Sequence, residues 1–584
     1  MKHLFTLNKY LVRYKWHFIL GILFVTGSNY FKVKIPQTIR KALDYVINLL
    51  EDPATVDQAI LNKSLLEFAV MILGLAALMG VFMYFMRQTI IVMSRLIEYD
   101  LRKDIYDHYQ KLDVSFYKTH KTGDIMSRIS EDVSKVRMYV GPAILYGINL
   151  TSLSALVIYS MFNVSVKLTM YTLLPLPFLS ISIYFVSRII HRKSGIIQKQ
   201  LSQITSVAQE VYSGIAVVKS YVQEKSFLRH FDQQSEDYKN RALDLARVNA
   251  FFFPLMILLV SSSTLLTVYI GSIEVANGNI SKGTIAEFII YVNFLTWPFT
   301  AVGWVASIIQ QAEASQERIN AFLDREPLIK NHTDAHTDIL GEIEFINVSF
   351  TYPETGVKAI DNLSFKLKRG EKLALIGKTA AGKSTIVDLI LRTYDIDEGK
   401  ILLDGTNVKD INIEDLRSQI GYVPQDVFLF STTIADNVRF GNPEATDAMI
   451  KKYSAHAAVN EDIEKLPQKY ETMVGERGVT LSGGQKQRIS LARAFIKNPK
   501  MVILDDSLSA VDTKTERKIL DYIKHAIENK TAIIITHRIF SLLDFDQIIF
   551  LKDGKILEQG SHEELINLKG NYFELYEKQQ LETV

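Results

Sequence analysis

Residues 372–390 have the sequence KLALIGKTAAGKSTIVDLI, and they decide the architecture of the second half of the chain. The apolar run 372–376 predicts a buried strand, and the residues from Thr385 onward are typical of a helix. Between them lies the glycine-rich pattern of a phosphate-binding loop, in its required context of strand, loop and helix. Glycine lets backbone N–H groups close around phosphate oxygens, and the following helix adds its positive N-terminus. The stretch therefore predicts a nucleotide-binding α/β domain.

Side chains in this loop and after a second strand complete the predicted phosphate site. Lys383 carries a point charge suited to the β and γ phosphates, and Ser384 supplies a hydroxyl suited to Mg²⁺. The apolar run 501–504 predicts a buried strand that ends at Asp505 and Asp506. Asp505 suits the Walker B role of a Mg²⁺ ligand, although paired carboxylates after a strand are also ordinary helix caps. The predicted nucleotide-binding residues of the loop are Gly377, Lys378, Thr379, Ala380, Ala381, Gly382, Lys383, Ser384 and Thr385.

The composition of the whole chain indicates two unlike halves. It has 584 residues, of which 48% are hydrophobic, no cysteine and a formal net charge of +2, with a mean hydropathy of +0.09. The apolar fraction excludes a disordered chain, and the missing cysteine excludes disulfide and thiolate–metal frameworks. Because the charge is close to neutral, no nucleic-acid partner is expected. A chain of this length has more than one domain.

Six long apolar runs lie in the first half of the chain. Each is long enough for the roughly 20 helical residues that cross a hydrocarbon core of about 30 Å. Buried core helices are the alternative, but the runs 144–162 and 168–186 contain no charged residue. The predicted spanning helices are residues 16–36, 65–87, 139–162, 165–189, 249–273 and 284–310. A multi-pass membrane domain is therefore expected, with membrane lipid as a partner.

Basic residues set the expected orientation of these helices. The segments after the second and fourth spans are rich in lysine and arginine, whereas 163–167 and 274–283 contain one lysine each. The positive-inside rule thus predicts that both basic segments, both termini and the second half lie in the cytoplasm, with the spans in the cell's inner membrane. Residues 1–15 are expected to lead into an uncleaved first helix, because they lack a small-residue cleavage site.

The two basic segments keep helical periodicity although they are polar, as Ile97, Leu101 and Ile105 illustrate. The spanning helices are therefore expected to extend well out of the membrane and turn back. Gly123 and Gly214 mark the expected reversals. On the pattern alone, a solvated helical hairpin without a role is the alternative.

The composition changes after the last predicted span. Residues 321–340 are polar, contain Pro327 and suit a linker. Beyond them, β-branched strand runs alternate with helical stretches, which predicts an α/β domain of about 240 residues. The expected domains are 1–320 in the membrane, the linker 321–340, and the nucleotide-binding domain 341–584.

A pentapeptide before the Walker B strand links the chain to a known family, because it matches the signature of ABC transporter ATPases. It consists of Leu481, Ser482, Gly483, Gly484 and Gln485. Four more residues resemble family elements in the family's order: the adenine-stacking aromatic Tyr352, the Q-loop Gln425, the D-loop Asp512 and the switch histidine His537. Six membrane helices followed by one P-loop ATPase domain resemble an ABC exporter half-transporter over the whole chain.

The resemblance implies ATP and Mg²⁺ as ligands and a dimer of half-transporters. In the family, ATP lies between the P-loop of one ATPase domain and the signature of a second, so Ser482, Gly484 and Gln485 would reach the γ phosphate bound to the partner. The implied catalytic residues are Asp506, His537 and Gln425, and the implied Mg²⁺ ligands are Ser384, Gln425 and Asp505. Gly123, Asp124 and Gly214 resemble the loops that couple the membrane helices to the ATPase domains.

Two positions depart from the family's pattern. Asp506 stands where the family's catalytic base is normally glutamate, and a displacement of about 1 Å at such a position can cost about 100-fold in rate. Ala380 stands where the loop usually has glycine, and its Cβ restricts the backbone if φ is positive. This combination resembles one subunit of bacterial heterodimeric multidrug exporters with one weak ATP site. A homodimer in which Asp506 is a working base is the alternative.

The transported substrate is not encoded by a short motif. Export of an amphipathic compound is the leading expectation, and a lipid or lipid-linked flippase has the same layout. The intact signature and the histidine argue against a third class, a regulatory membrane ATPase that transports nothing. Polar groups are costly inside a membrane. Four lie near the predicted spans: Asn29, Glu67, Arg87 and Glu287. They either line a substrate path or lie at helix ends at the interface.

Overall fold

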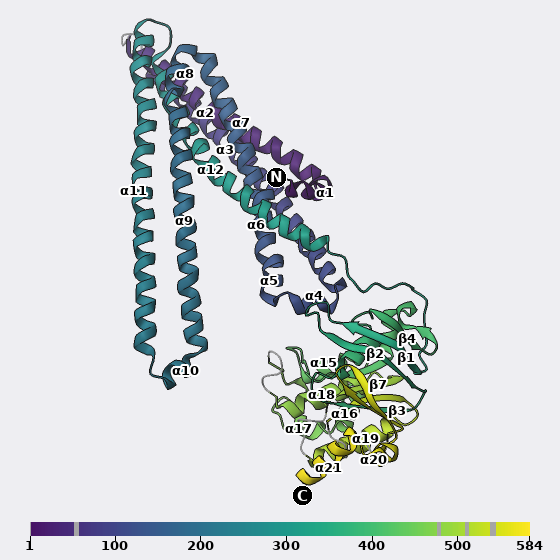
Figure 1. Ribbon diagram of the computed structural model, residues 1–584. Coiled ribbons are helices and arrows are strands. Elements are labelled where there is room, and N and C mark those ends of the chain that lie inside the picture. The colour runs from purple at the N-terminus through teal and green to yellow at the C-terminus, as the bar shows by residue number, and fades with distance from the viewer. Residues whose placement is uncertain (1, 52–57, 476–480, 508–512, 538–544, 584) are drawn as a thin grey trace. The chain divides into compact units, whose positions relative to one another are not determined.

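A computed structural model describes residues 2–51, 58–475, 481–507, 513–537 and 545–583 of the chain (Figure 1). The chain forms two compact units. The first contains Met1–Gln110 and Gly123–Arg325, and the second contains Lys111–Thr122 and Glu326–Val584. A short segment from the first half of the sequence therefore belongs to the second unit.

Among the described residues, six helices are long and apolar enough to span a membrane, which confirms the predicted number of spans. The helices are longer than their apolar runs. α3 (Gln58–Lys111) has 54 residues, about 80 Å at 1.5 Å per residue, against about 30 Å of hydrocarbon. The other long helices are α2 (Lys15–Glu51), α7 (Ile144–Val164), α9 (Pro175–Ser213), α11 (Glu224–Ala276) and α12 (Lys282–Leu323).

Short helices connect the long ones. α9 and α11 lie side by side and are joined by α10 (Figure 1). Gly214 lies between α9 and α10, where the chain begins its reversal, and Gly123 lies in the first turn of α5. The short elements are η1 (His3–Leu7), α1 (Asn8–Arg13), α4 (Val114–Thr119), α5 (Thr122–Ser127), α6 (Val133–Met138), α8 (Val166–Leu173) and α10 (Ile215–Ser220), with two π-helical turns, η3 (Arg128–Asp132) and η4 (Tyr139–Ala143).

Polar residues near the spans fall into two groups. Asn29 is buried, and its Nδ2 donates to Ser152 Oγ at 2.6 Å, which joins α2 to α7. Glu287 is also buried and pairs with Arg40, joining α12 to α2. Glu67 and Arg87 are exposed on α3. The two buried residues therefore connect helices, because an unpaired polar group is costly in an apolar surrounding.

The second unit contains two sheets (Figure 1). An antiparallel sheet has the strand order β2-β1-β4-β5, and a mostly parallel sheet has the order β10-β9-β3-β8-β7-β6. The strands are β1 (Ile343–Thr351), β2 (Lys358–Leu367), β3 (Lys372–Gly377), β4 (Glu398–Leu403), β5 (Thr406–Asn407), β6 (Ile420–Val423), β7 (Met501–Asp505), β8 (Thr531–Ile535), β9 (Gln547–Lys552) and β10 (Lys555–Gly560). The predicted strands 372–376 and 501–504 lie in β3 and β7.

Helices enclose the parallel sheet and complete the α/β architecture expected from the sequence. Along β7, Ile503 packs in one hydrophobic core with α13, whereas Val502 and Leu504 pack in another with α15, α16 and α18. This alternation follows from the opposite directions of successive strand side chains. The helices are α13 (Lys383–Ile390), α14 (Ile413–Ser418), α15 (Ile434–Arg439), α16 (Asp447–His456), α17 (Asn460–Glu464), α18 (Gly483–Phe495), α19 (Thr513–Ala526), α20 (His562–Leu568) and α21 (Asn571–Thr583), with the 3₁₀ turns η5 (Val408–Asp410) and η6 (Lys469–Glu471).

The strand register brings the predicted phosphate site together. Ile535 of β8 pairs with Leu375 of β3 on one side and with Asp505 of β7 on the other. Parallel strands place their carboxyl ends at the same edge of the sheet. The phosphate-binding loop after β3 and the carboxylates after β7 therefore share this edge, although more than a hundred residues of sequence separate them.

Candidate nucleotide-binding site

The loop between β3 and α13 has the backbone that a phosphate cradle requires. Gly382 has φ +99° and precedes α13 directly. A Cβ at this position would lie 2.6 Å from Ala359 O, so only glycine fits. Ala380 also has a positive φ, +65°. The Cβ of Ala380 therefore restricts the backbone here, because alanine holds a left-handed conformation that glycine adopts without strain.

Lys383 is held inside the loop by backbone carbonyls. Its Nζ donates to Gly377 O at 2.8 Å and to Lys378 O at 2.9 Å, and the side chain is 7% exposed. Burial lowers the pKa of Lys383, and the carboxylates of Asp505 and Asp506 oppose that shift. The ammonium group is therefore already placed in the loop that would hold phosphate oxygens.

Asp505 is the buried acid of the site, at 2% exposure. Burial raises its pKa, while a hydrogen bond from Ser384 and the charges of Lys383 and His537 lower it. A hydroxyl and a carboxylate in contact form the hard oxygen pair that Mg²⁺ prefers, so these residues fit the ion that ATP carries. When bound, Mg²⁺ neutralises charge on the β and γ phosphates.

The three predicted catalytic residues lie after neighbouring strands of the same sheet. Gln425 follows β6, Asp506 follows β7 and His537 follows β8, and the side chains of Gln425 and His537 are exposed. The backbone N–H of Asp506 donates to Ile535 O at 2.9 Å, and its φ is +45°. Aspartate tolerates this left-handed conformation better than most residues. The order β8-β7-β6 thus lines up all three at one edge of the sheet.

Tyr352 lies beside the loop, and both its hydroxyl and its ring have contacts there. Its hydroxyl is 3.0 Å from Thr385 Oγ1, and its ring makes an edge contact with Tyr394 at 5.3 Å between centroids. Lys118, which belongs to the second unit, places Nζ 5.2 Å from the Tyr352 ring and 5.0 Å from the Tyr394 ring. Such a cation is attracted by the ring electrons. Lys118 and Tyr394 were missed in the sequence, because no local pattern connects them with Tyr352.

The segment that carries Lys118 is anchored by Asp113. One carboxylate oxygen of Asp113 accepts from Phe116 N at 3.2 Å and caps α4. The other accepts from Leu328 N at 2.8 Å. A single carboxylate therefore ties the start of α4 to the chain that enters the second unit.

The signature pentapeptide forms the exposed N-terminus of α18. Ser482 Oγ accepts from Gln485 N at 3.3 Å, and Gln485 Oε1 accepts from Ser482 N at 3.0 Å, which is a capping box. Leu481 is buried as the anchor, while Ser482 and Gly483 are exposed and Gly484 is partly exposed. The helix N-terminus offers positive charge to an anion.

Three further predicted residues have separate positions. Asp124 lies in α5 and pairs with Arg128 at 2.6 Å, next to Gly123. Gly214 has φ −98°, so its conformation does not require glycine. Asp512 lies outside the described residues.

Comparison with known proteins agrees with this geometry. Residues 18–299 match the family described as ABC transporter transmembrane region, and residues 360–509 match the family described as ABC transporter. The probable multidrug resistance ABC transporter ATP-binding/permease protein YheI of Bacillus subtilis is 36% identical over 511 residues, 87% of each chain. The chain belongs to the ABC transporter family.

Other ABC transporters are similar over nearly the full length. The multidrug resistance-like ATP-binding protein MdlA of Escherichia coli is 34% identical over 538 residues, 92% of this chain and 91% of that protein. A putative multidrug export ATP-binding/permease protein of Staphylococcus aureus is 32% identical over 555 residues, 94% of each. As an ABC transporter, the chain combines a membrane domain and an ATP-hydrolysing domain in the layout of an exporter half-transporter.

Proposed function

We propose that the chain is one subunit of an ATP-driven exporter of amphipathic compounds in the cytoplasmic membrane, with both termini and the ATPase domain on the cytoplasmic side. The observation that best supports a dimer is the exposed capping box of Ser482 and Gln485 at the start of α18. Each chain has one such helix end and one phosphate-binding loop. The names of the relatives, multidrug resistance or multidrug export proteins, support the class of substrate.

The helical hairpin of α9 and α11 supports a partner as well. Its connection carries exposed apolar side chains, among them Tyr212, Tyr221 and Val222, with 73–77% of their surface exposed. Apolar groups gathered at one exposed turn favour a protein partner. Gly214 belongs to this turn, to which the proposal assigns the coupling of the two subunits.

The residues of the site divide the work of an ATP cycle. Lys383 holds the β and γ phosphates, Tyr352 offers its ring to the adenine, and Ser384 with Asp505 holds the metal ion that ATP brings. Asp506 and His537 face the water that attacks the γ phosphate. The signature serine of the partner subunit closes over that phosphate, so ATP favours the closed dimer and biases the membrane helices toward one of two states.

The dimer is proposed to be a heterodimer. Aspartate is one methylene shorter than glutamate, so the Asp506 carboxylate ends about 1 Å or more short of the place from which a glutamate would position the attacking water, which lowers the rate. Ala380 adds backbone strain to the same loop. The weak site built by Lys383, Asp505 and Asp506 would then be paired with a competent site, to which this chain contributes its intact signature and the partner a glutamate.

Transport measurements test the exporter. Inside-out vesicles that contain the chain and its partner are expected to accumulate a fluorescent amphipathic drug when ATP is added, and Lys383→Ala is expected to abolish this. Lys400→Ala is the matched control, because Lys400 is an exposed lysine of β4, outside the phosphate-binding loop. ATP hydrolysis without accumulation of drug or labelled lipid would contradict export. Drug that displaces labelled lipid separates an exporter from a flippase.

ATPase measurements test the heterodimer. The chain purified alone is expected to hydrolyse ATP slowly, and Asp506→Asn is expected to change that rate little. Robust drug-stimulated activity of the single chain, lost in Asp506→Asn, would show that a homodimer works with aspartate as its base.

A further inference from the structure

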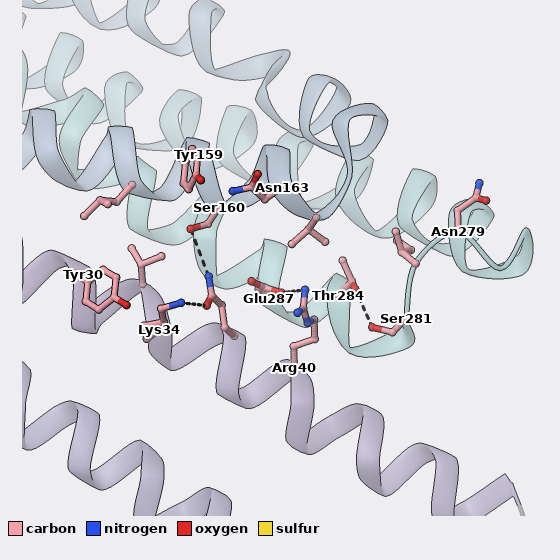
Figure 2. A pocket seen from close by; sticks show the side chains of 15 residues that line it. Tyr30, Lys34, Arg40, Tyr159, Ser160, Asn163, Asn279, Ser281, Thr284 and Glu287 are labelled. Atoms are coloured by element: carbon pink, nitrogen blue, oxygen red, sulfur yellow. Dashed lines mark hydrogen bonds and ion pairs between the residues drawn. The ribbon is translucent and has the colours of Figure 1, made fainter.

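A polar cavity lies among three helices of the membrane unit, away from the nucleotide site. Its volume is about 530 Å³, and it is lined by α2, α7, the start of α12 and the preceding connection (Figure 2). This is the end of the spans where the short connections lie. Lys34 and Arg40 come from α2, Ser160 and Asn163 from α7, and Glu287 from α12 (Figure 2).

Two of the three charged groups in the cavity neutralise each other. Arg40 Nη1 is 2.9 Å from Glu287 Oε2, and the Glu287 side chain is fully buried. Glu287 Oε1 also accepts from the Tyr291 hydroxyl at 2.8 Å. Asp44, one turn beyond Arg40 on α2, is occupied by Ser281 and the backbone N–H of Gly283. The charge of Arg40 is therefore neutralised by Glu287.

Lys34 is the cation without such a partner. Its Nζ donates to Gln37 Oε1 at 3.0 Å, and the Gln37 amide in turn reaches Ser160 Oγ at 3.5 Å (Figure 2). Within the part of the chain that the structure describes, no carboxylate lies within 4 Å of Lys34 Nζ. Asp44 is ten residues away along the helix, about 15 Å. A positive charge near an apolar span without a counter-ion is costly unless a ligand supplies one.

An apolar groove continues from the polar cavity. It shares Tyr30 and Leu156 with the cavity and follows one face of α2 from Ile19, and Phe82 of α3 also lines it. From Ile19 to Tyr30 the helix covers about 16 Å. The groove is lined almost entirely by apolar side chains, so a hydrocarbon chain fits it where water does not.

We propose that the cavity and the groove together bind an anionic amphiphile, a molecule with one carboxylate or phosphate group and one long hydrocarbon chain. The anionic group lies against Lys34, with the amides of Gln37 and Asn163 and the hydroxyl of Ser160 as neutral hydrogen-bond partners. The hydrocarbon chain follows α2 past Tyr30 toward Ile19. All parts of this site come from one chain.

The inference rests on the proposed function only in taking this molecule to be a transported compound. Binding itself needs neither ATP nor hydrolysis, because no residue of the site belongs to the ATPase domain. A failure of transport and a failure of binding are therefore separate results.

Binding of a fluorescent oleate analogue tests the proposal, with the full-length protein in phosphatidylcholine nanodiscs without nucleotide. Lys34→Gln is expected to weaken binding about tenfold, the value of one hydrogen bond to a charged group, and Lys34→Arg is expected to restore it. Lys32→Gln is the matched control: Lys32 lies on the same helix but over the Phe294 ring, outside the cavity. Equal binding by Lys34→Gln and the unchanged protein would overturn the proposal.

Two further probes keep the test independent of the variants. Octanoate and oleylamine are expected to compete at least about tenfold more weakly than oleate, because one lacks the long chain and the other the negative charge. Competition by oleylamine as strong as that by oleate would overturn the proposal. Nanodiscs with added phosphatidylglycerol identify the natural source: loss of oleate binding supports a lipid headgroup, and unchanged binding supports a free amphiphile.

Discussion

The phosphate-binding loop and the signature pentapeptide both belong to the ATP site of the family, but their surroundings differ. Lys383 is 7% exposed, bonded to two carbonyls of its own loop and close to Asp505 and Asp506. Ser482 is exposed, and its hydrogen bonds with Gln485 cap its own helix. The loop therefore has its lysine and carboxylates within one chain, whereas the signature is an exposed helix N-terminus, which the proposed function assigns to ATP bound by the partner.

The two regions can therefore be used to separate ATP binding from closure of the dimer. Damage to the loop should remove ATP from this chain's own site, and damage to the signature should leave that ATP in place but disable the site on the partner. Variants of the two regions can therefore confirm or contradict the division of roles.

The largest effect is expected from Lys383→Ala. Loss of the charged bonds to the β and γ phosphates should weaken ATP binding at this site about 1000-fold, because each such bond contributes about 1.5–3 kcal/mol. Binding of a fluorescent ATP analogue to the full-length protein measures this. Lys400→Ala, exposed on β4 outside the loop, should bind within about twofold of the unchanged protein; equal losses in both variants would contradict the role of Lys383.

Ser482→Ala should lower ATP hydrolysis by the complex with the partner about 100-fold, the usual cost of removing one donor to a developing charge. ATP binding by this chain should not change. The substitution also removes a helix cap, worth about 1 kcal/mol. Ser561→Ala is the control for that loss, because Ser561 and Glu564 form a similar capping box on α20. A signature that is only structural predicts equal hydrolysis in the two variants.

Asp506→Glu should raise hydrolysis at the loop's own site about tenfold, because the longer side chain brings its carboxylate toward the attacking water. ATPase rates of the purified complex measure the gain, with the partner's own site inactivated. The same exchange combined with His537→Ala should show no gain. A rate that stays constant or falls in Asp506→Glu supports the working aspartate of the homodimer.

Ala380→Gly should have the smallest effect. Relief of the left-handed alanine outweighs the entropy that glycine adds to the unfolded chain by only about 0.5 kcal/mol. The midpoint temperature of thermal unfolding of the full-length protein should rise slightly, and its affinity for ATP should not change. Ala381→Gly is the opposite control, because Ala381 has a negative φ and is buried, so its replacement should destabilise. A stabilised Ala381→Gly would contradict the strain at 380.

Much of the architecture was predictable because its signals are local. The runs 144–162 and 168–186 are apolar over enough residues to indicate a membrane helix, and the loop 377–385 lies in one stretch between a strand and a helix. The position of the loop and of Asp505 at the carboxyl ends of their strands follows from the general rule for ligand sites in α/β sheets. These features need no knowledge of distant contacts.

The contacts that the sequence does not reveal join residues far apart along the chain. Glu287 was singled out as a costly polar group, but nothing local indicates that Arg40 is its partner. Lys118 lies in a segment read as an extension of the membrane helices, yet it lies over Tyr352 and Tyr394 of the second unit. Pairings of this kind are set by tertiary packing, which a single sequence does not specify.

The segment Lys111–Thr122 has a mechanical consequence. The residues on both sides of it belong to the first unit, so the chain crosses between the units before Lys111, after Thr122 and again before Glu326. A body held by one strand of chain swivels freely, but one held at separate points transmits torque. A rotation of the second unit would therefore act on the first at α3 and at α5, where Asp124 pairs with Arg128.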